Sequence, residues 1–105
     1  MVNGVADVTA RKVELLKMMF REFTSTAADL ARQIEAEEER SRIKDHTHVA
    51  YSTLAKALAV RRSNLLISAA EVEKKLLEAQ RVLDEARVRA SVPAGATENP
   101  APRVA

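Results

Sequence analysis

The stretch of sequence that decides the fold is KDHTHVAYST, residues 44–53. It is rich in residues that hydrogen-bond locally to the backbone and therefore disfavour helix interiors. Asp45, Thr47 and Ser52 are each suited to cap a helix that begins after them. From residue 5 to residue 92 the chain contains neither glycine nor proline. We therefore predict a turn at this stretch, between two long helices.

Apolar residues recur at spacings of three and four on both sides of this turn, which is the pattern of coiled-coil a and d positions. Before the turn the recurring residues are Val13, Leu16, Phe20, Phe23, Ala27, Leu30 and Ile34. After the turn they are Tyr51, Ala55, Leu58, Leu65, Ala69, Val72, Leu76, Ala79, Leu83, Ala86 and Ala90, with Arg62 as the one defect. The pattern predicts one apolar seam along each helix.

A fold-back near residue 46 brings the two seams together with large residues mostly opposite small ones. The facing pairs are Phe23–Ala69, Ala27–Leu65, Phe20–Val72 and Val13–Ala79. Such complementarity fills a narrow core without voids, and it favours an antiparallel hairpin. At the defect, we expect the stem of Arg62 to cover Leu30 while its guanidinium reaches the glutamates of residues 35–39.

The expected fold is thus all-α, an antiparallel two-helix coiled-coil hairpin with a disordered C-terminal tail. Its expected parts are a flexible arm at 1–6, helix one at 7–42, a turn at 43–48, helix two at 49–90 and the tail at 91–105. The tail contains all three prolines of the chain. The rod would be roughly 50–60 Å long. A hairpin of this size buries little core, so a homo-oligomer, as in a four-helix bundle, stays open.

Composition argues against several other classes. Aromatic residues make up only 3% of the chain, which disfavours a β-sandwich or barrel. Cysteine is absent, so no disulfide framework or thiolate metal site is expected. The sequence shows neither a membrane-spanning run of ~20 apolar residues nor a signal-peptide pattern. The 17 basic and 15 acidic residues are interleaved, which argues against nucleic acid as a partner. We expect a cytoplasmic protein.

Few residues suggest catalysis or metal binding. His46 and His48, with Asp45 beside them, offer three ligands for zinc, but no fourth lies nearby and a polar turn is the preferred interpretation. The glutamates of residues 35–39 lie on a rod with no pocket to desolvate them, so we interpret them as a solvated face. We predict no enzyme, and accordingly no catalytic residue, cofactor or metal.

Apolar residues outside the seams predict two partner-binding surfaces. The hypothesised binding residues are Val60, Arg61, Asn64 and Ile67 near the turn, and Leu15, Met18 and Met19 near the open end. Val60 and Ile67 share the outward position of successive heptads, with Leu66 flanking them. The methionines near the open end suit adaptable docking. Scattered surface hydrophobes, which are common, are the alternative interpretation.

Six short segments lie in a particular order across the turn. They are ADLARQIEAEEER (28–40), IKD (43–45), HVAY (48–51), AKA (55–57), RRSNL (61–65) and SA (68–69). In this order and spacing the chain resembles the FliJ family of flagellar export proteins, in its short alphaproteobacterial form. In that family a glutamate-rich end of helix one is followed by an aspartate, a His-aromatic-Ala-Tyr turn and an Arg-Arg-Asp/Asn-Asn-Leu run.

The resemblance implies a non-enzymatic antiparallel coiled coil in the flagellar type III export apparatus, similar to the central stalk of a rotary ATPase. Such proteins engage the hexameric export ATPase and the cytoplasmic domain of the export gate, and they escort substrates and export chaperones. For this chain the resemblance implies a cytoplasmic location, at the inner face of the membrane. The alternative function is that of a self-assembling or secreted helical-hairpin structural protein unrelated to flagella.

The two binding surfaces differ in how far they follow the family. The surface near the turn retains the Arg-Arg-x-Asn-Leu motif in residues 61–65. Family members open with a basic, regular helix, whereas residues 1–10 of this chain form a weakly helical sequence. We therefore expect side binding of the export gate to be retained better than insertion of the open end into an ATPase ring.

Overall fold

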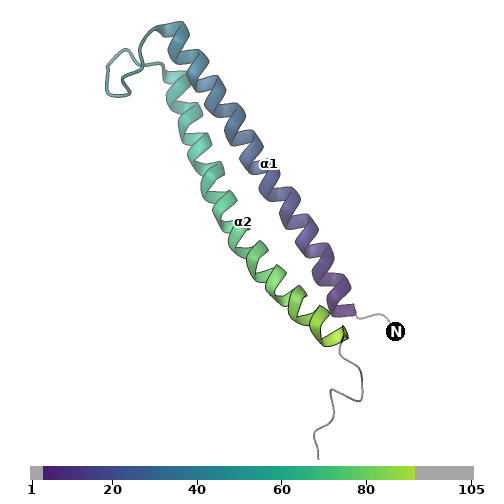
Figure 1. The fold of residues 1–105 in the computed structure, drawn as a ribbon. Helices are drawn as coiled ribbons and strands as arrows, with labels where there is room; N and C mark the ends of the chain where they lie inside the picture. The colour runs from purple at the N-terminus through teal and green to yellow at the C-terminus, as the bar shows by residue number, and fades with distance from the viewer. Residues whose placement is uncertain (1–3, 92–105) are drawn as a thin grey trace, which may run out of the picture.

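The structure is a computed structural model that describes residues 4–91. Two long helices, α1 (Gly4–Ser41) and α2 (Thr53–Ser91), lie side by side and run antiparallel (Figure 1). The described residues contain no strand, so the predicted all-α hairpin is confirmed. No helix within residues 4–91 combines the length and apolar character needed to cross a membrane. Apart from Ser91, which ends α2, the predicted tail lies outside the described residues.

Helix α1 begins at Gly4, three residues earlier than predicted. The reason is packing, because Ala6 and Ala10 both lie against the apolar cluster between the helices. Asp7 in the first turn also favours this start, since its carboxylate faces the positive end of the helix dipole. The expected flexible arm at 1–6 is therefore corrected, because residues 4–6 belong to the helix.

Helix α1 ends at Ser41 because the next residue leaves the helical conformation. Arg42 has a φ of 66°, in the left-handed region, and its N–H donates to the carbonyl of Glu38 at 2.8 Å. This geometry is the αL form of helix C-cap, which glycine usually occupies. The predicted end at residue 42 is one residue late.

The connection runs over residues 42–52 and is longer than the predicted turn at 43–48. Asp45 shapes its middle part, since Asp45 Oδ1 accepts from the N–H of Thr47 at 2.9 Å and from its hydroxyl at 2.7 Å. Two successive backbone turns follow, with His48 N–H donating to Asp45 and Tyr51 N–H to His48, each at 3.0 Å. These turns occupy the chain up to Tyr51, so helix two begins at 53 rather than 49.

Of the three residues suited to cap α2, Ser52 does so. Its hydroxyl oxygen accepts from the N–H of Ala55 at 3.1 Å, and its carbonyl accepts the first helical hydrogen bond from Lys56, also at 3.1 Å. This is the position at which serine is strongly preferred, because its oxygen satisfies an N–H left free at the helix start. Asp45 and Thr47 instead shape the connection.

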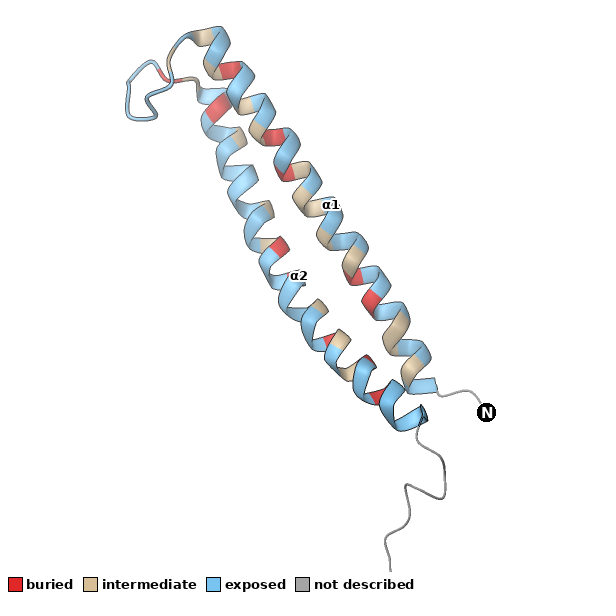
Figure 2. Ribbon diagram, viewed as in Figure 1, coloured by how far each residue is buried: buried red, intermediate tan, exposed pale blue. Residues whose placement is uncertain are grey.

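The core follows the predicted seams, and buried residues line the facing sides of the two helices (Figure 2). The buried apolar residues are Val13, Leu16, Ala27, Leu30, Tyr51, Ala55, Ala69, Val72, Ala79, Leu83 and Ala86. Val13 and Ala79 belong to one cluster, and Phe20 packs against that cluster with Val72, as the predicted register requires. Among the described residues no large side chain is completely buried, so the core is thin.

The predicted contact between the Arg62 guanidinium and the glutamates of α1 is wrong. Arg62 is exposed, and the carboxylates of α1 find partners closer to them in the sequence. Glu37 pairs with Arg40, Glu38 with His46 and Glu39 with Lys44. Arg62 forms no ion pair with any of these within residues 4–91, so its guanidinium is left to solvent.

Candidate protein-interaction surfaces

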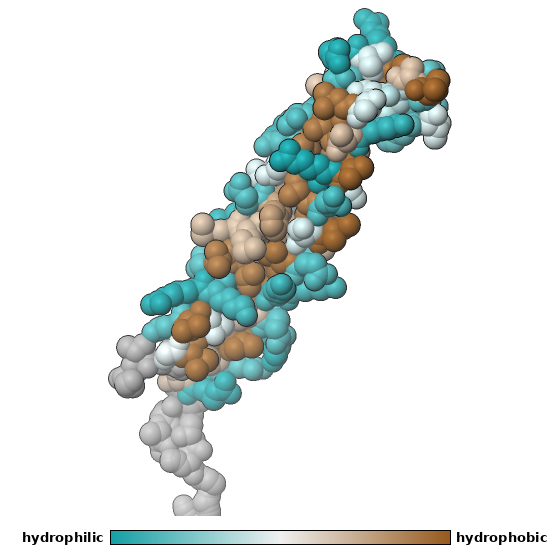
Figure 3. Space-filling view, turned by 180° about the vertical axis from the view of Figure 1, so that it is seen from behind, coloured by the Kyte–Doolittle hydropathy of each residue, from teal (hydrophilic) through white to brown (hydrophobic). Residues whose placement is uncertain are grey.

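The turn-proximal surface (Val60, Arg61, Asn64 and Ile67) lies on α2, outside the seam. All four residues are exposed, and Val60 and Ile67 each retain 62% of their accessible surface. Val60, Asn64 and Ile67 are spaced by four and three residues, so they share one face of the helix. Arg61 lies beside Asn64 at the edge of that face. On the side of the molecule displayed in Figure 3, apolar patches lie along the hairpin and are interrupted by hydrophilic side chains.

Val60 also borders a groove of about 450 Å³ that the sequence analysis missed. The other lining residues are Ile34, His46, Tyr51, Lys56, Ala59 and Arg62. The groove combines α1, the connection and α2, so no contiguous pattern could have shown it. Arg62, rather than Arg61, is the arginine of its lining. The only indication of this groove in the sequence was the seam position of Tyr51, because a buried ring so close to the turn must pack against both helices.

The open-end surface (Leu15, Met18 and Met19) lies on α1, and its three residues retain 56%, 61% and 36% of their surface. Val8 lies two turns before Leu15 and is 64% exposed, while Val5 is 62% exposed. Both valines extend this surface toward the start of α1. Neither valine was among the predicted binding residues, although Val8 is one heptad before Leu15 and Val5 one heptad before Lys12, on the same side of the helix.

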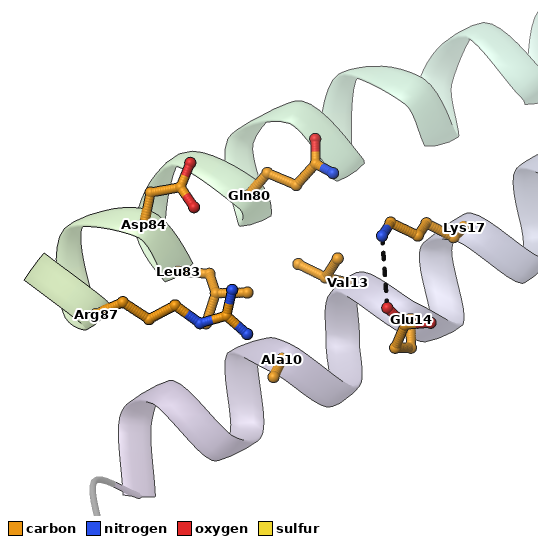
Figure 4. A pocket seen from close by; sticks show the side chains of 8 residues that line it. All are labelled: Ala10, Val13, Glu14, Lys17, Gln80, Leu83, Asp84 and Arg87. Carbon is orange, nitrogen blue, oxygen red and sulfur yellow. Dashed lines mark hydrogen bonds and ion pairs between the residues drawn. The ribbon is translucent and has the colours of Figure 1, made fainter.

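A second groove, of about 480 Å³, lies between the helices near the open end (Figure 4). Val13 and Leu83 are apolar residues of its lining, and the charged side chains around it are Glu14, Lys17, Asp84 and Arg87. Two cations and two carboxylates balance, so the groove does not select an ion of either sign. Its residues on α1 lie on the opposite side of the seam from Leu15 and Met19, so the groove and the open-end surface are separate.

The connection is held to α1 by hydroxyl groups that donate to two glutamates. The hydroxyl of Tyr51 donates to Glu38 Oε2 at 2.6 Å, and His46 Nε2 lies 3.2 Å from the same oxygen. The hydrogen bond from Tyr51 lowers the pKa of Glu38, and His46 lowers it further. The same hydrogen bond, together with burial, raises the pKa of Tyr51 to about 12. The His46 ring meets the Tyr51 ring edge-on, with centroids 5.0 Å apart.

Glu37, the neighbouring carboxylate, is buried and accepts from both arms of the hairpin. Arg40 donates to it along α1, with Nε at 3.2 Å from Oε2, and the hydroxyl of Ser52 donates to Oε1 at 2.9 Å. These two interactions, with Arg40 the stronger, lower the pKa of Glu37. The glutamates of residues 35–39 therefore form only a partly solvated face, because Glu37 and Glu38 accept hydrogen bonds that hold the connection against α1.

The two histidines are used within the connection. His46 contacts Glu38 and Tyr51, and His48 Nδ1 accepts from the N–H of Ala50 at 2.9 Å. Across residues 4–91 no three side chains of histidine, cysteine, aspartate or glutamate gather closely enough to hold a metal ion. The polar groups around the turn thus serve to fix its shape.

No protein-family model, curated protein or solved structure matches this chain. The exposed apolar surfaces of the hairpin and the order of short segments around its turn are therefore the features that bear on its function.

Proposed function

We propose that this chain is a non-enzymatic, protein-binding component of the flagellar type III export apparatus, a coiled-coil stalk or escort that links the export ATPase to the export gate. The observation that carries the proposal is the exposure of Val60 and Ile67, each 62%, around the RRSNL segment. The seam residues pack between the two helices, so a partner has to bind outward positions such as Val60 and Ile67. The long antiparallel helices agree with the form that the resemblance implies.

The two surfaces would serve different partners. The turn-proximal surface lies along the side of the rod, where it suits a folded domain such as the cytoplasmic domain of the export gate. The open-end surface, with its methionines, suits the ring of the export ATPase. Both partners place the protein in the cytoplasm, at the inner face of the membrane. The intact RRSNL segment favours gate binding as the better retained of the two activities.

The test uses the purified chain and the purified cytoplasmic domain of the export gate, with binding measured by calorimetry. We expect the double substitution Arg61→Glu with Ile67→Asp to weaken binding at least tenfold, because it places carboxylates on the surface that contacts the partner. The matched control is Val88→Asp with Arg89→Glu, which makes the same change at exposed positions near the other end of α2. Thermal melts followed by circular dichroism should match the parent for both.

The outcomes separate the two surfaces. If the turn-proximal variant binds the gate like the parent while Met18→Asp does not, the open end is the binding surface. If the parent binds neither the gate domain nor the hexameric ATPase, the flagellar proposal is overturned. Self-assembly into larger particles in that case would favour the structural or secreted hairpin.

A further inference from the structure

Helix α2 carries a second apolar stripe on its flank, beside the seam that contacts α1. We call it the outer seam of α2 (Ala59, Ser63, Leu66, Ala70, Glu73 and Leu77), and its residues recur at the same spacings of four and three as the inner seam. All six are exposed, with Leu66 at 39% and Leu77 at 61%. Glu73 is the only charged residue among them. A helix with two such stripes is typical of bundles in which each helix packs against more than one neighbour.

Because the core is thin, covering this stripe would add to the little apolar surface that the hairpin buries. Five of the eleven buried apolar residues are alanine, and no large side chain within residues 4–91 is completely buried. Two helices alone leave each other's outer sides in water, so they bury a smaller fraction of apolar surface than a bundle does. Covering Leu66 and Leu77 would remove apolar area from water, which is favourable.

The outer seam is complementary to itself when two copies run antiparallel. A two-fold axis level with Ser68 sets Leu66 against the partner's Ala70 and Leu77 against the partner's Ala59, so that each leucine meets an alanine. The same register sets Glu73 against the partner's Ser63, whose hydroxyl can donate to the carboxylate. Two-fold symmetry repeats every contact and closes the assembly at two chains.

One pair of opposite charges beside the seam agrees with this register. Arg62 precedes Ser63 and therefore lies near the partner's Glu73. Within the described part of a single chain, neither Arg62 nor Glu73 forms an ion pair, so both charges are available to each other. More broadly, α2 carries no acidic residue before Glu71. Antiparallel pairing thus keeps the basic first halves of the two α2 helices apart, and it places each beside the half of the partner's α2 in which acidic and basic residues alternate.

From these observations we propose that a second copy of this chain covers the outer seam, forming an antiparallel four-helix dimer through α2. The dimer does not depend on the flagellar role. The contact would run from Lys56 to Gln80, about 36 Å by the helical rise. One helix against one helix of this length gives a small interface, so the dimer should be reversible and dependent on concentration.

The first test is sedimentation of the full chain over a wide range of concentrations. We expect the mass to rise from that of one 11.6 kDa chain to that of two. Leu66→Glu with Leu77→Glu should weaken dimerisation at least tenfold, because it places like charges in the contact. The matched control, Val8→Glu with Leu15→Glu, alters exposed positions on α1 and should dimerise like the parent. Circular dichroism at the lowest concentration shows that each variant remains helical.

The second test checks the register, and it is clean because the chain has no cysteine of its own. Chains with Ala59→Cys are mixed with chains carrying Leu77→Cys and oxidised. The mixed disulfide should form at least tenfold faster than either like-with-like disulfide. Like-with-like disulfides in excess would overturn the antiparallel arrangement. A parent that stays monomeric at every concentration, or an outer-seam variant that dimerises like the parent, would overturn the dimer itself.

Discussion

Ser52 and Glu37 join the two arms of the hairpin through one hydroxyl group. The Ser52 hydroxyl donates to Glu37 Oε1 at 2.9 Å, and the hydroxyl oxygen of Ser52 accepts from the N–H of Ala55 at 3.1 Å. One side chain therefore caps α2 and ties its start to the last turns of α1. This arrangement sets where α2 begins and how it lies against α1.

We expect Ser52→Ala to lower the free energy of unfolding by about 1–2 kcal/mol, because it removes the cap and one donor to a buried carboxylate. Urea denaturation followed by circular dichroism measures the change. Ser25→Ala, on the exposed face of α1, is the control and should have little effect. Equal stability of the two variants would contradict the role of Ser52.

Arg42 offers a stabilising substitution. Its φ of 66° is costly for any residue with a Cβ, whereas glycine adopts it freely. Arg42→Gly should therefore raise the free energy of unfolding by roughly 1 kcal/mol. Arg42→Ala removes the same exposed side chain but keeps the Cβ, so it should give no gain. A gain of equal size from alanine would show that the charge, rather than the backbone, matters.

Acid should weaken the hydrogen bonds that Glu37 and Glu38 accept from Ser52 and Tyr51 at the turn. The pKa values of Glu37 and Glu38 in the folded chain lie below the ordinary 4.5. The two carboxylates therefore contribute fully to the free energy of unfolding above pH 4.5, and this contribution is lost as the pH falls through their pKa values in the folded chain. Urea midpoints measured from neutral pH downward should fall most steeply below 4.5. Glu37→Gln should start lower and fall less. Glu22→Gln, an exposed change on α1, should follow the parent.

Base should act on Tyr51, the only tyrosine of the chain. Its pKa rises from the ordinary 10 to about 12, so its contribution is present below pH 10 and is lost as the pH rises toward 12. Tyrosinate absorbance reports this group alone and should show the raised pKa in the folded chain. Glu38→Gln replaces the accepting carboxylate and should lower that pKa toward 10. An unchanged titration in this variant would mean that the hydrogen bond is not its main cause.

Phe23 tests the register of the inner seam. It packs against the apolar cluster, so Phe23→Asp exposes the core to a charge and should destabilise the hairpin by about 3–5 kcal/mol. Ser25→Asp makes the same charge at an exposed position of α1 and should leave the thermal melt nearly unchanged. A Phe23→Asp variant that melts like the parent would refute the register.

The helices and their pairing were predictable because the seam is a periodic signal over many turns. The ends of the helices were not, since they depend on single contacts. The left-handed Arg42 ends α1, the Asp45 and His48 turns delay α2, and packing of Ala6 extends α1 toward its start. None of these has a periodic signature in the sequence.

The candidate surfaces were predictable only in part. Exposure of Val60, Ile67 and Met18 follows from their positions outside the seam, and the structure agrees. The groove beside Val60 was not predictable, because Ile34 and Tyr51 come to it from other segments. Nor was the burial of Glu37, since a run of glutamates gives no sign of which one will face the partner arm.

The apolar cluster around Val13, Val72 and Leu83 lies toward the open end, while the hydroxyl–carboxylate contacts lie at the turn. Hydrophobic contacts weaken on cooling, whereas ionised carboxylates respond to acid. Cold and acid would therefore loosen opposite ends of the same rod. Amide hydrogen exchange would rise first near residue 13 in the one case and near residue 52 in the other.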